Sequence, residues 1–319
     1  MSQIPVIDFG EFQSNPAKVA KHVLEACKSI GFFYMINHGV PETDIDQAFE
    51  LAKSYFDQSE EEKRKHLISE DNYGYSSLYT EKLDPATQRQ GDHKEGFNFR
   101  NFVNGKSFAP LPPLFEENKT FIESFSRTCH ATATRVLEAF AIALEIPESA
   151  GGKQWFAARH QYDSLSGQIL RFLKYPRGAE ADYKEPLRAG AHSDYGSVTL
   201  LFQKDVPGLE VQASRTEWIA APLIPGAIIV NVGDQMEFWT NGLFKSTLHR
   251  VTFLPEHNHV DRYSIPFFVH PGDDVPLTPI PSHLIPRNDK KEEEEKEAKV
   301  ITAGEHLRNR LNATYVYGA

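Results

Sequence analysis

The chain has 319 residues, of which 40% are hydrophobic and 24% are charged, and it carries a formal net charge of −10. This balance is typical of a globular protein with one large domain or two small ones. An acidic chain with no basic cluster is not expected to bind nucleic acid or an anionic membrane. The apolar runs are too short to span a bilayer, and the N-terminus lacks the pattern of a signal peptide. The two cysteines, Cys27 and Cys129, fit a reducing compartment without a disulfide scaffold. We therefore expect a cytoplasmic protein, and a monomer.

The first half of the chain predicts a mixed region in which helices predominate. It begins with a short strand, a helix that ends near Gly31, a buried strand and a second amphipathic helix. Residues 70–113 are rich in Gly, Pro, Asn and Asp, and they predict a long irregular connection. A long helix with apolar positions on one side is expected over residues 116–146.

From Gln168 onward the pattern changes to short strands separated by turn residues, as in a sandwich or jelly roll. The predicted strands include QILRFLKYP, SVTLLFQ, GLEVQ, EWIAAP, AIIVNVGD, MEFWT, FKSTLHRVTF and DRYSIPFFVHP. Thr302 and Glu305 have the spacing of a capping box, so a final helix should start there. The charge run at 290–299 predicts a solvated loop or an extension of that helix.

We therefore predict a fold that is mainly β with flanking helices. An N-terminal region of helical and mixed structure is expected at 1–115. The region at 116–319 is expected to contain the long helix, a jelly-roll core and the C-terminal helix.

Three residues form a candidate metal site. His192 and Asp194 are two residues apart at the head of an alternating apolar run, and in an extended backbone such residues point to the same side. His249 lies in a later predicted strand. Two neutral imidazoles and one carboxylate are the ligands that bind non-haem Fe(II) and leave other positions open. A zinc site is the competing interpretation, but zinc cannot reduce dioxygen.

Arg262 and Ser264 form a candidate anion site. They are also two residues apart, and Arg262 opens an otherwise apolar strand, which disfavours a surface salt bridge. A bidentate guanidinium and a hydroxyl that face one spot would hold a carboxylate, such as the far carboxylate of a 2-oxo acid. Even spacing sends Phe268 to the same face, provided that Pro266 introduces no bulge. There Phe268 would either stack on a flat or apolar substrate or belong to the core.

Together these motifs resemble those of the iron- and 2-oxoglutarate-dependent dioxygenases, in particular the isopenicillin N synthase-like branch. The resemblance rests on IPVIDF, GFFYMINHGVP, KEGFNF, LKYP, AHSDYGSVTLLFQ, VNVGDQMEFWTNG, KSTLHRV and RYSI, which cover nearly the whole chain. It implies a double-stranded β-helix core with Fe(II) bound by His192, Asp194 and His249. It also implies that Arg262 and Ser264 hold the distal carboxylate of 2-oxoglutarate.

The resemblance extends to the co-substrate site and to the reaction. Tyr175 matches a tyrosine that contacts the co-substrate in plant members, although it can equally be a core aromatic residue, and Leu173 stands where those members often have Asn. The implied activity is oxidation of a small organic molecule, usually hydroxylation, with release of succinate and CO2. Ascorbate would be a stimulant. Two alternatives stay open: a small-molecule sensor on the same fold, and a family oxidase that does not use 2-oxoglutarate.

Other polar residues are interpreted as structural. Asn231 and Asp234 are expected to form a turn and not to bind a metal. His257 and His259 lie in a polar loop and should be solvated, and His270, at a strand end, should be structural.

Overall fold

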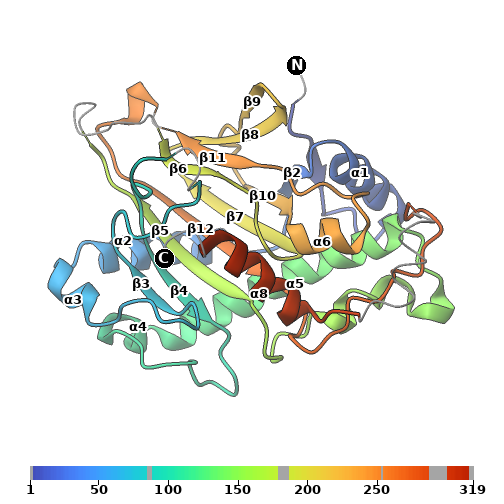
Figure 1. The fold of residues 1–319 in the computed structure, drawn as a ribbon, viewed down its shortest axis with the longest axis horizontal. Coiled ribbons are helices and arrows are strands. Elements are labelled where there is room, and N and C mark those ends of the chain that lie inside the picture. The colour runs from blue at the N-terminus through green and yellow to red at the C-terminus, as the bar shows by residue number, and fades with distance from the viewer. Residues whose placement is uncertain (1–2, 85–87, 179–186, 253, 287–299, 316–319) are drawn as a thin grey trace.

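The computed structural model describes residues 3–84, 88–178, 187–252, 254–286 and 300–315. Two β-sheets lie on either side of a cavity, and helices cover the outer face of the larger sheet (Figure 1). This arrangement confirms the predicted class, which is mainly β with flanking helices.

The described strands are β1 (Val6–Asp8), β2 (Phe32–Ile36), β3 (Gly74–Ser76), β4 (Glu95–Arg100), β5 (Ile169–Tyr175), β6 (Leu187–His192), β7 (Val198–Lys204), β8 (Leu209–Ser214), β9 (Glu217–Ala220), β10 (Ala227–Val232), β11 (His249–Thr252) and β12 (Arg262–Val269). The described helices are α1 (Pro16–Ser29), α2 (Glu42–Phe56), α3 (Glu60–Arg64), α4 (Pro113–Glu117), α5 (Lys119–Ala143), α6 (Asp234–Trp239) and α8 (Ala303–Tyr315). Short 3₁₀ helices are η1 (Glu148–Ala150), η2 (Gly152–Gln154), η3 (Ala157–Arg159) and η5 (Pro255–His257).

The larger sheet has the strand order β1-β2-β10-β7-β12-β5-β4-β3, and the smaller sheet has the order β6-β11-β8-β9. All of these pairs are antiparallel except β1 with β2. Strands β1 to β4, from the N-terminal region, therefore lie in the same sheet as β5, β7, β10 and β12. The connection at 70–113 was predicted to be irregular, and this is wrong at β3 and β4. With three residues, β3 is too short for a visible alternation, and β4 is buried along most of its length.

The two faces of the larger sheet have different partners. On β7, Val198, Leu200 and Phe202 belong to the main apolar core, and the ring of Phe202 lies 5.6 Å from that of Phe125 on α5. Thr199 and Leu201 alternate with them and line the cavity. Burying each large apolar side chain stabilises the fold by about 1.5–3 kcal/mol, so the packing of α5 on the outer face stabilises the sheet that forms one wall of the cavity.

Helix α6 replaces a predicted strand. The segment MEFWT was expected to be extended because it is rich in aromatic and apolar residues, but Met236 and Trp239 are buried at helical spacing in α6. The strand β10 ends at Val232, and Gly233 precedes the helix. The first turn of the helix contains two acidic residues, Asp234 and Glu237. Acidic side chains in the first turn stabilise a helix. The burial of Met236 and Trp239 on one side of α6 outweighs the strand preference of the aromatic residues.

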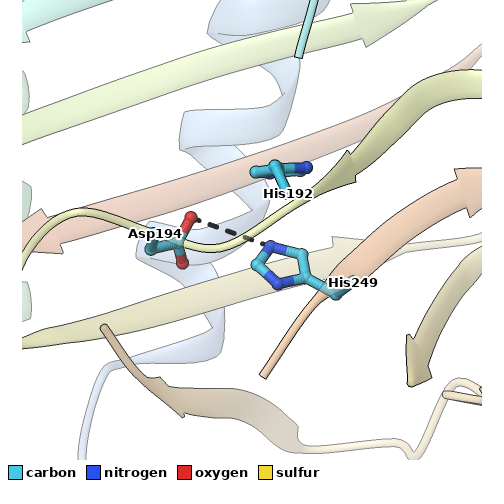
Figure 2. A group of neighbouring side chains, drawn as sticks. All are labelled: His192, Asp194 and His249. Carbon is cyan, nitrogen blue, oxygen red and sulfur yellow. Dashed lines mark ion pairs between the residues drawn. The ribbon is translucent and has the colours of Figure 1, made fainter. Parts of the chain in front are cut away.

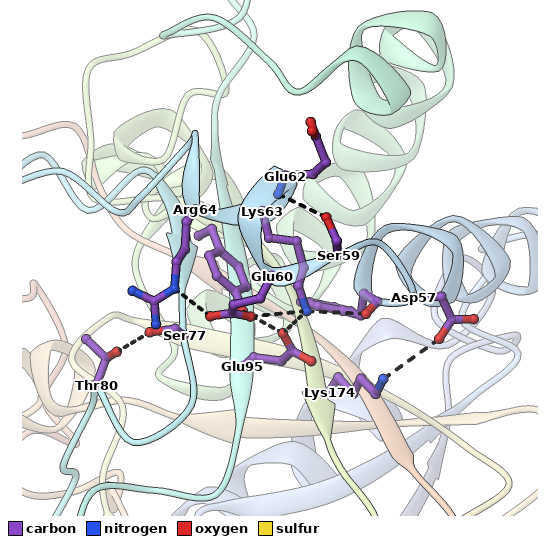
Figure 3. Close-up of polar contacts among 12 residues, drawn as sticks. Asp57, Ser59, Glu60, Glu62, Lys63, Arg64, Ser77, Thr80, Glu95 and Lys174 are labelled. Atoms are coloured by element: carbon purple, nitrogen blue, oxygen red, sulfur yellow. Dashed lines mark hydrogen bonds and ion pairs between the residues drawn. The ribbon is translucent and has the colours of Figure 1, made fainter.

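A buried ion pair connects helix α3 to strand β4 (Figure 3). Lys63 Nζ on α3 lies 2.6 Å from Glu95 Oε2, and each side chain is 6% exposed. The Tyr75 hydroxyl donates to the same carboxylate at 2.7 Å and to Glu60 at 2.9 Å. Glu95 is on the face of β4 turned away from the cavity, because its neighbour Lys94 lines the cavity.

The C-terminal helix begins as predicted. The Thr302 backbone N–H donates to Glu305 Oε2 at 2.8 Å, and the Glu305 N–H donates to Thr302 Oγ1 at 3.2 Å, which is a capping box. Helix α8 crosses in front of the larger sheet (Figure 1), and its residues Leu307 and Leu311 line the cavity. The charge run at 290–299, expected to be solvated, lies outside the described residues. Within the described residues, no helix has the length and apolar character needed to cross a membrane.

Candidate metal centre and anion site

A cavity of about 400 Å³ lies between the two sheets, a size suited to small-molecule ligands. Strands of both sheets contribute to its wall, and α8 lies at one side of it. His192, Asp194, His249, Arg262, Ser264, Tyr175 and Phe268 all line this single cavity. The structure therefore brings together in one cavity every residue that the sequence analysis predicted to bind the metal, the co-substrate or the substrate.

His192, Asp194 and His249 meet where the smaller sheet approaches the larger one (Figure 2). His192 ends β6 and His249 begins β11, and the two are directly paired across these strands. Asp194 follows in the loop after β6. One donor atom from each side chain lies within 4.8 Å of the other two, and His249 Nε2 is 3.7 Å from Asp194 Oδ1. These spacings fit three ligands of one ion.

The hydrogen bonds of the two imidazoles determine which nitrogen is free. His192 Nδ1 lies 2.8 Å from the carbonyl oxygen of Gly190, and His249 Nδ1 lies 3.2 Å from that of Thr247. A carbonyl oxygen only accepts, so Nδ1 carries the hydrogen in both rings, and Nε2 of the neutral ring keeps its lone pair. Both lone pairs are therefore available to a metal.

Burial controls the charge of the cluster. Burial, followed by the neighbouring His249, holds the pKa of His192 well below its usual range, so this imidazole is neutral. Burial opposes ionisation of Asp194, but His249, His192 and two hydrogen bonds outweigh it and lower the pKa of this carboxyl. The neutral ring of His192, the ionised carboxylate of Asp194 and the imidazole of His249, whose Nε2 faces that carboxylate, match the two-histidine, one-carboxylate donor set that Fe(II) takes in non-haem oxygenases. The residues present therefore fit such an ion.

Arg262 presents a buried positive charge to the same cavity. Its side chain is among the largest that are fully buried, and burial lowers its pKa. Nη2 donates to Gln203 Oε1 at 2.8 Å, Nη1 lies 3.5 Å from Ser264 Oγ, and Cζ lies 4.9 Å from the ring centre of Tyr175. Its Nε has no hydrogen-bond partner, and in the described part of the chain no carboxylate forms an ion pair with it. An unneutralised buried charge is costly, so this site is suited to an anion.

Phe268 lies on the cavity side of β12, in line with Arg262 and Ser264. The register of β12 against β7 runs without a shift from Tyr263 to Val269, so Pro266 introduces no bulge. The alternation expected from the sequence thus extends along the whole strand.

Asn231 was predicted to form a turn, and this is wrong. It lies within β10 and is buried, and its Nδ2 donates to Asp194 Oδ2 at 2.7 Å. Thr199 Oγ1 donates to the same oxygen at 2.7 Å. The signal that could have identified Asn231 is a single amide inside the apolar run AIIVNV, because a buried polar group needs a partner. Asp234 is in the first turn of α6, and its backbone N–H donates to the Asp194 carbonyl at 2.7 Å.

The remaining histidines belong to no metal-binding group found among the described residues. His259 is exposed, as expected for a solvated side chain, whereas His257 is partly buried. His270 is buried and lines the cavity. Its imidazole closely approaches Gly196 in the loop after Asp194, so it packs against the metal-site loop.

Comparisons with known proteins agree with this geometry. Residues 4–119 match the model of the non-haem dioxygenase in morphine synthesis N-terminal family, and residues 166–271 match that of the 2OG-Fe(II) oxygenase superfamily. The chain is 37% identical to UPF0676 protein C1494.01 of Schizosaccharomyces pombe, over 99% of this chain and 94% of that protein. It is 30% identical to 1-aminocyclopropane-1-carboxylate oxidase of Dictyostelium mucoroides, over 91% of this chain and 86% of the oxidase.

A solved structure is similar along almost the entire length. The crystal structure of full-length Neurospora crassa thymine-7-hydroxylase with alpha-KG and thymine is 29% identical and has a TM-score of 0.81, covering 98% of this chain and 97% of that one. The resemblance of RAGAHSDYGSVTLLFQ, KSTLHRV and RYSI to fungal thymine dioxygenase is thereby confirmed. The chain belongs to the 2OG-Fe(II) oxygenase superfamily and is an oxidoreductase of that family.

Proposed function

We propose that this protein is an Fe(II)- and 2-oxoglutarate-dependent dioxygenase that hydroxylates a small organic molecule and releases succinate and CO2. His192, Asp194 and His249 are the proposed iron ligands. Arg262 and Ser264, with Tyr175 beside them, are the proposed site for the distal carboxylate of 2-oxoglutarate. The main support for the proposal is the content of the cavity. Two histidines and one carboxylate lie in the same cavity as Arg262, which is buried and forms no ion pair within the described residues.

Each group has a defined task in this proposal. The Nε2 atoms of the two histidines and Oδ1 of Asp194 would hold the ion at the cavity wall. When bound, Fe(II) and 2-oxoglutarate supply the electrons that activate dioxygen. Arg262 neutralises the far carboxylate with a charge-assisted bond and thereby orients the co-substrate. The apolar side chains in the cavity wall, Leu173, Leu201 and Phe268, would exclude water from the reacting atoms.

The prime substrate is proposed to be small and to combine an apolar part with polar groups. Leu173, Leu201 and Phe268 offer apolar contacts, whereas Lys94 and Arg171 add charged groups to the same cavity wall. The thymine complex of the Neurospora relative and the amino-acid substrate in the name of the Dictyostelium oxidase both concern small polar molecules. A screening panel should therefore contain nucleobases, small amino acids and other small acids, and flavonoid-like aromatics.

The test is substrate-dependent release of succinate from 2-oxoglutarate with Fe(II) and ascorbate. The proposal expects succinate and an oxidised product to appear together for at least one compound of the panel. A protein that binds Fe(II) and 2-oxoglutarate but never forms succinate would be a sensor on the same fold. Oxidation of a substrate without succinate would identify an oxidase that does not use 2-oxoglutarate.

Phe268→Ala tests the substrate part of the proposal. If Phe268 stacks on the substrate, the variant should bind the prime substrate more weakly while its affinities for iron and 2-oxoglutarate stay close to those of the wild type. A loss of about 3–5 kcal/mol of folding stability, without a selective binding defect, would make Phe268 a packing residue.

We further propose a cytoplasmic monomer. Cys27 and Cys129 are both buried free thiols, which suits a reducing compartment. Light scattering of the purified protein and fractionation of the source cells would test the two statements separately.

A further inference from the structure

The carboxylate of Asp194 is held asymmetrically. Its Oδ2 accepts two hydrogen bonds of 2.7 Å, from Thr199 Oγ1 and from Asn231 Nδ2. Its Oδ1 accepts neither of them and points toward His249, whose Nε2 is 3.7 Å away (Figure 2). Both donors are 3% exposed, so water does not compete with them. One oxygen is therefore occupied by the protein, and the other is free for a ligand.

The two donors form a rigid pair. Thr199 on β7 and Asn231 on β10 are directly opposite each other in the antiparallel register, so their side chains stand side by side on the cavity face. On the far side of β10, Asn231 is paired with Phe32 of β2. The ring of Phe32 contacts that of His249 edge-on, with centroids 5.4 Å apart. The donors thus stand on the central strands of the larger sheet and not on a loop.

The loop that contains Asp194 is held in place by the residues that follow Asn231. The backbone N–H of Asp234 donates to the Asp194 carbonyl at 2.7 Å. A Cβ on Gly233 would come within 2.2 Å of the Gly196 carbonyl oxygen, so only glycine permits this approach. Residues 231–234 therefore hold both the side chain and the backbone of Asp194, and the carboxylate cannot rotate without breaking buried hydrogen bonds.

We infer that Thr199 and Asn231 are positioning residues that restrict Asp194 to binding the metal through Oδ1 alone. The inference rests on the proposed function, because it concerns the iron site of the dioxygenase. A carboxylate that binds through both oxygens occupies two positions of an octahedral ion. With three one-atom protein ligands, three positions stay open, which suffices for the two oxygens of 2-oxoglutarate and one of dioxygen. The two donors thus keep the co-substrate site open.

Thr199→Val is the decisive variant, since valine has nearly the same shape but lacks the hydroxyl. Thr199→Ser is the matched control, because it keeps the donor. Asn231→Leu removes the second donor and gives an independent measurement if Thr199→Val fails to fold. Two quantities are measured without oxygen: the Kd for Fe(II), and the visible absorption band that forms when 2-oxoglutarate chelates the bound iron. Thermal unfolding of the metal-free proteins reports on structure alone.

We expect the Kd for Fe(II) to rise roughly 10- to 100-fold in Thr199→Val and in Asn231→Leu, which is the usual effect of removing a group that orients a metal ligand. At saturating iron, the 2-oxoglutarate band should also weaken in both variants, because Asp194 can then bind through both oxygens. Thr199→Ser should keep the wild-type values. A purely structural role would lower the unfolding temperature and leave the Kd and the band of the folded protein unchanged.

The possible failures are distinguishable. If the wild type binds no Fe(II), the proposed function fails. If the wild type binds Fe(II) and shows the band, but Thr199→Val and Asn231→Leu bind it equally well and show the same band, the inference is overturned and the proposed function stands.

Discussion

Replacing Arg262 with glutamine is expected to weaken 2-oxoglutarate binding without destabilising the ligand-free protein. The guanidinium is buried, and its hydrogen bonds go to Gln203 and weakly to Ser264, with no carboxylate to balance its charge among the described residues. Removing a buried charge of this kind also removes its desolvation cost. The free energy of unfolding of the ligand-free variant should therefore equal or exceed that of the wild type.

The size of the binding effect follows from the lost interaction. A hydrogen bond to a charged group contributes about 1.5–3 kcal/mol, which corresponds to roughly a tenfold to hundredfold change in Kd. A ligand present at 100 times its Kd stabilises the folded state by about 2.7 kcal/mol. If the Kd rises hundredfold at the same concentration, that stabilisation falls to about 0.4 kcal/mol.

Urea unfolding under anaerobic conditions, with Fe(II) and with or without 2-oxoglutarate, measures the free energy of unfolding and its increase when 2-oxoglutarate binds. Arg127→Gln is the control, because Arg127 is a partly exposed arginine on α5 that pairs with Glu123 and Asp163 and does not line the cavity. This control should keep the full stabilisation by 2-oxoglutarate. If Arg262→Gln also keeps it, Arg262 is not the carboxylate site, and the reasoning from its unbalanced charge is refuted.

Three further predictions concern the metal, the buried ion pair and acid sensitivity. Asp194→Ala should bind no Fe(II) at concentrations that saturate the wild type, because one of three protein ligands is lost; metal analysis after gel filtration checks this. Lys63→Met leaves Glu95 as a buried unpaired charge and should cost about 3–5 kcal/mol in urea unfolding, whereas Lys53→Met, in an exposed pair, should cost less than about 1 kcal/mol. Burial lowers the pKa of His160 from 6.5 to about 3, so as the pH falls below 6.5 the unfolded chain takes up a proton that the folded chain does not. The free energy of unfolding should fall by about 2 kcal/mol from this residue between pH 7 and pH 5, and His160→Gln should show a correspondingly shallower pH dependence; an unchanged slope would contradict the assignment.

The residues expected to hold the co-substrate could be predicted from the sequence because strand geometry is local. Arg262, Ser264 and Phe268 are related by even spacing, and the extended backbone of β12 places them on one face. Asp194 lies in the loop after β6, so its place beside His192 does not follow from strand alternation. The cavity lining follows this rule along the whole of β12.

The partners of these residues could not be predicted, because they depend on contacts between distant strands. Asn231 was interpreted as a turn residue, and only the pairing of β10 with β7 places it beside Thr199 and Asp194. The segment MEFWT has the composition of a strand, yet packing after Gly233 makes it helix α6. Gln203 meets Arg262 only because β7 and β12 are neighbours in the sheet.

Anaerobic titration of the wild-type protein with Fe(II) and then with 2-oxoglutarate tests the proposed iron and co-substrate sites directly. It needs no knowledge of the prime substrate. We expect each chain to bind one Fe(II), 2-oxoglutarate then to produce a visible charge-transfer band, and His249→Ala to show neither. Iron binding that survives in His249→Ala, or a wild-type protein whose spectrum does not respond to 2-oxoglutarate, would contradict this expectation.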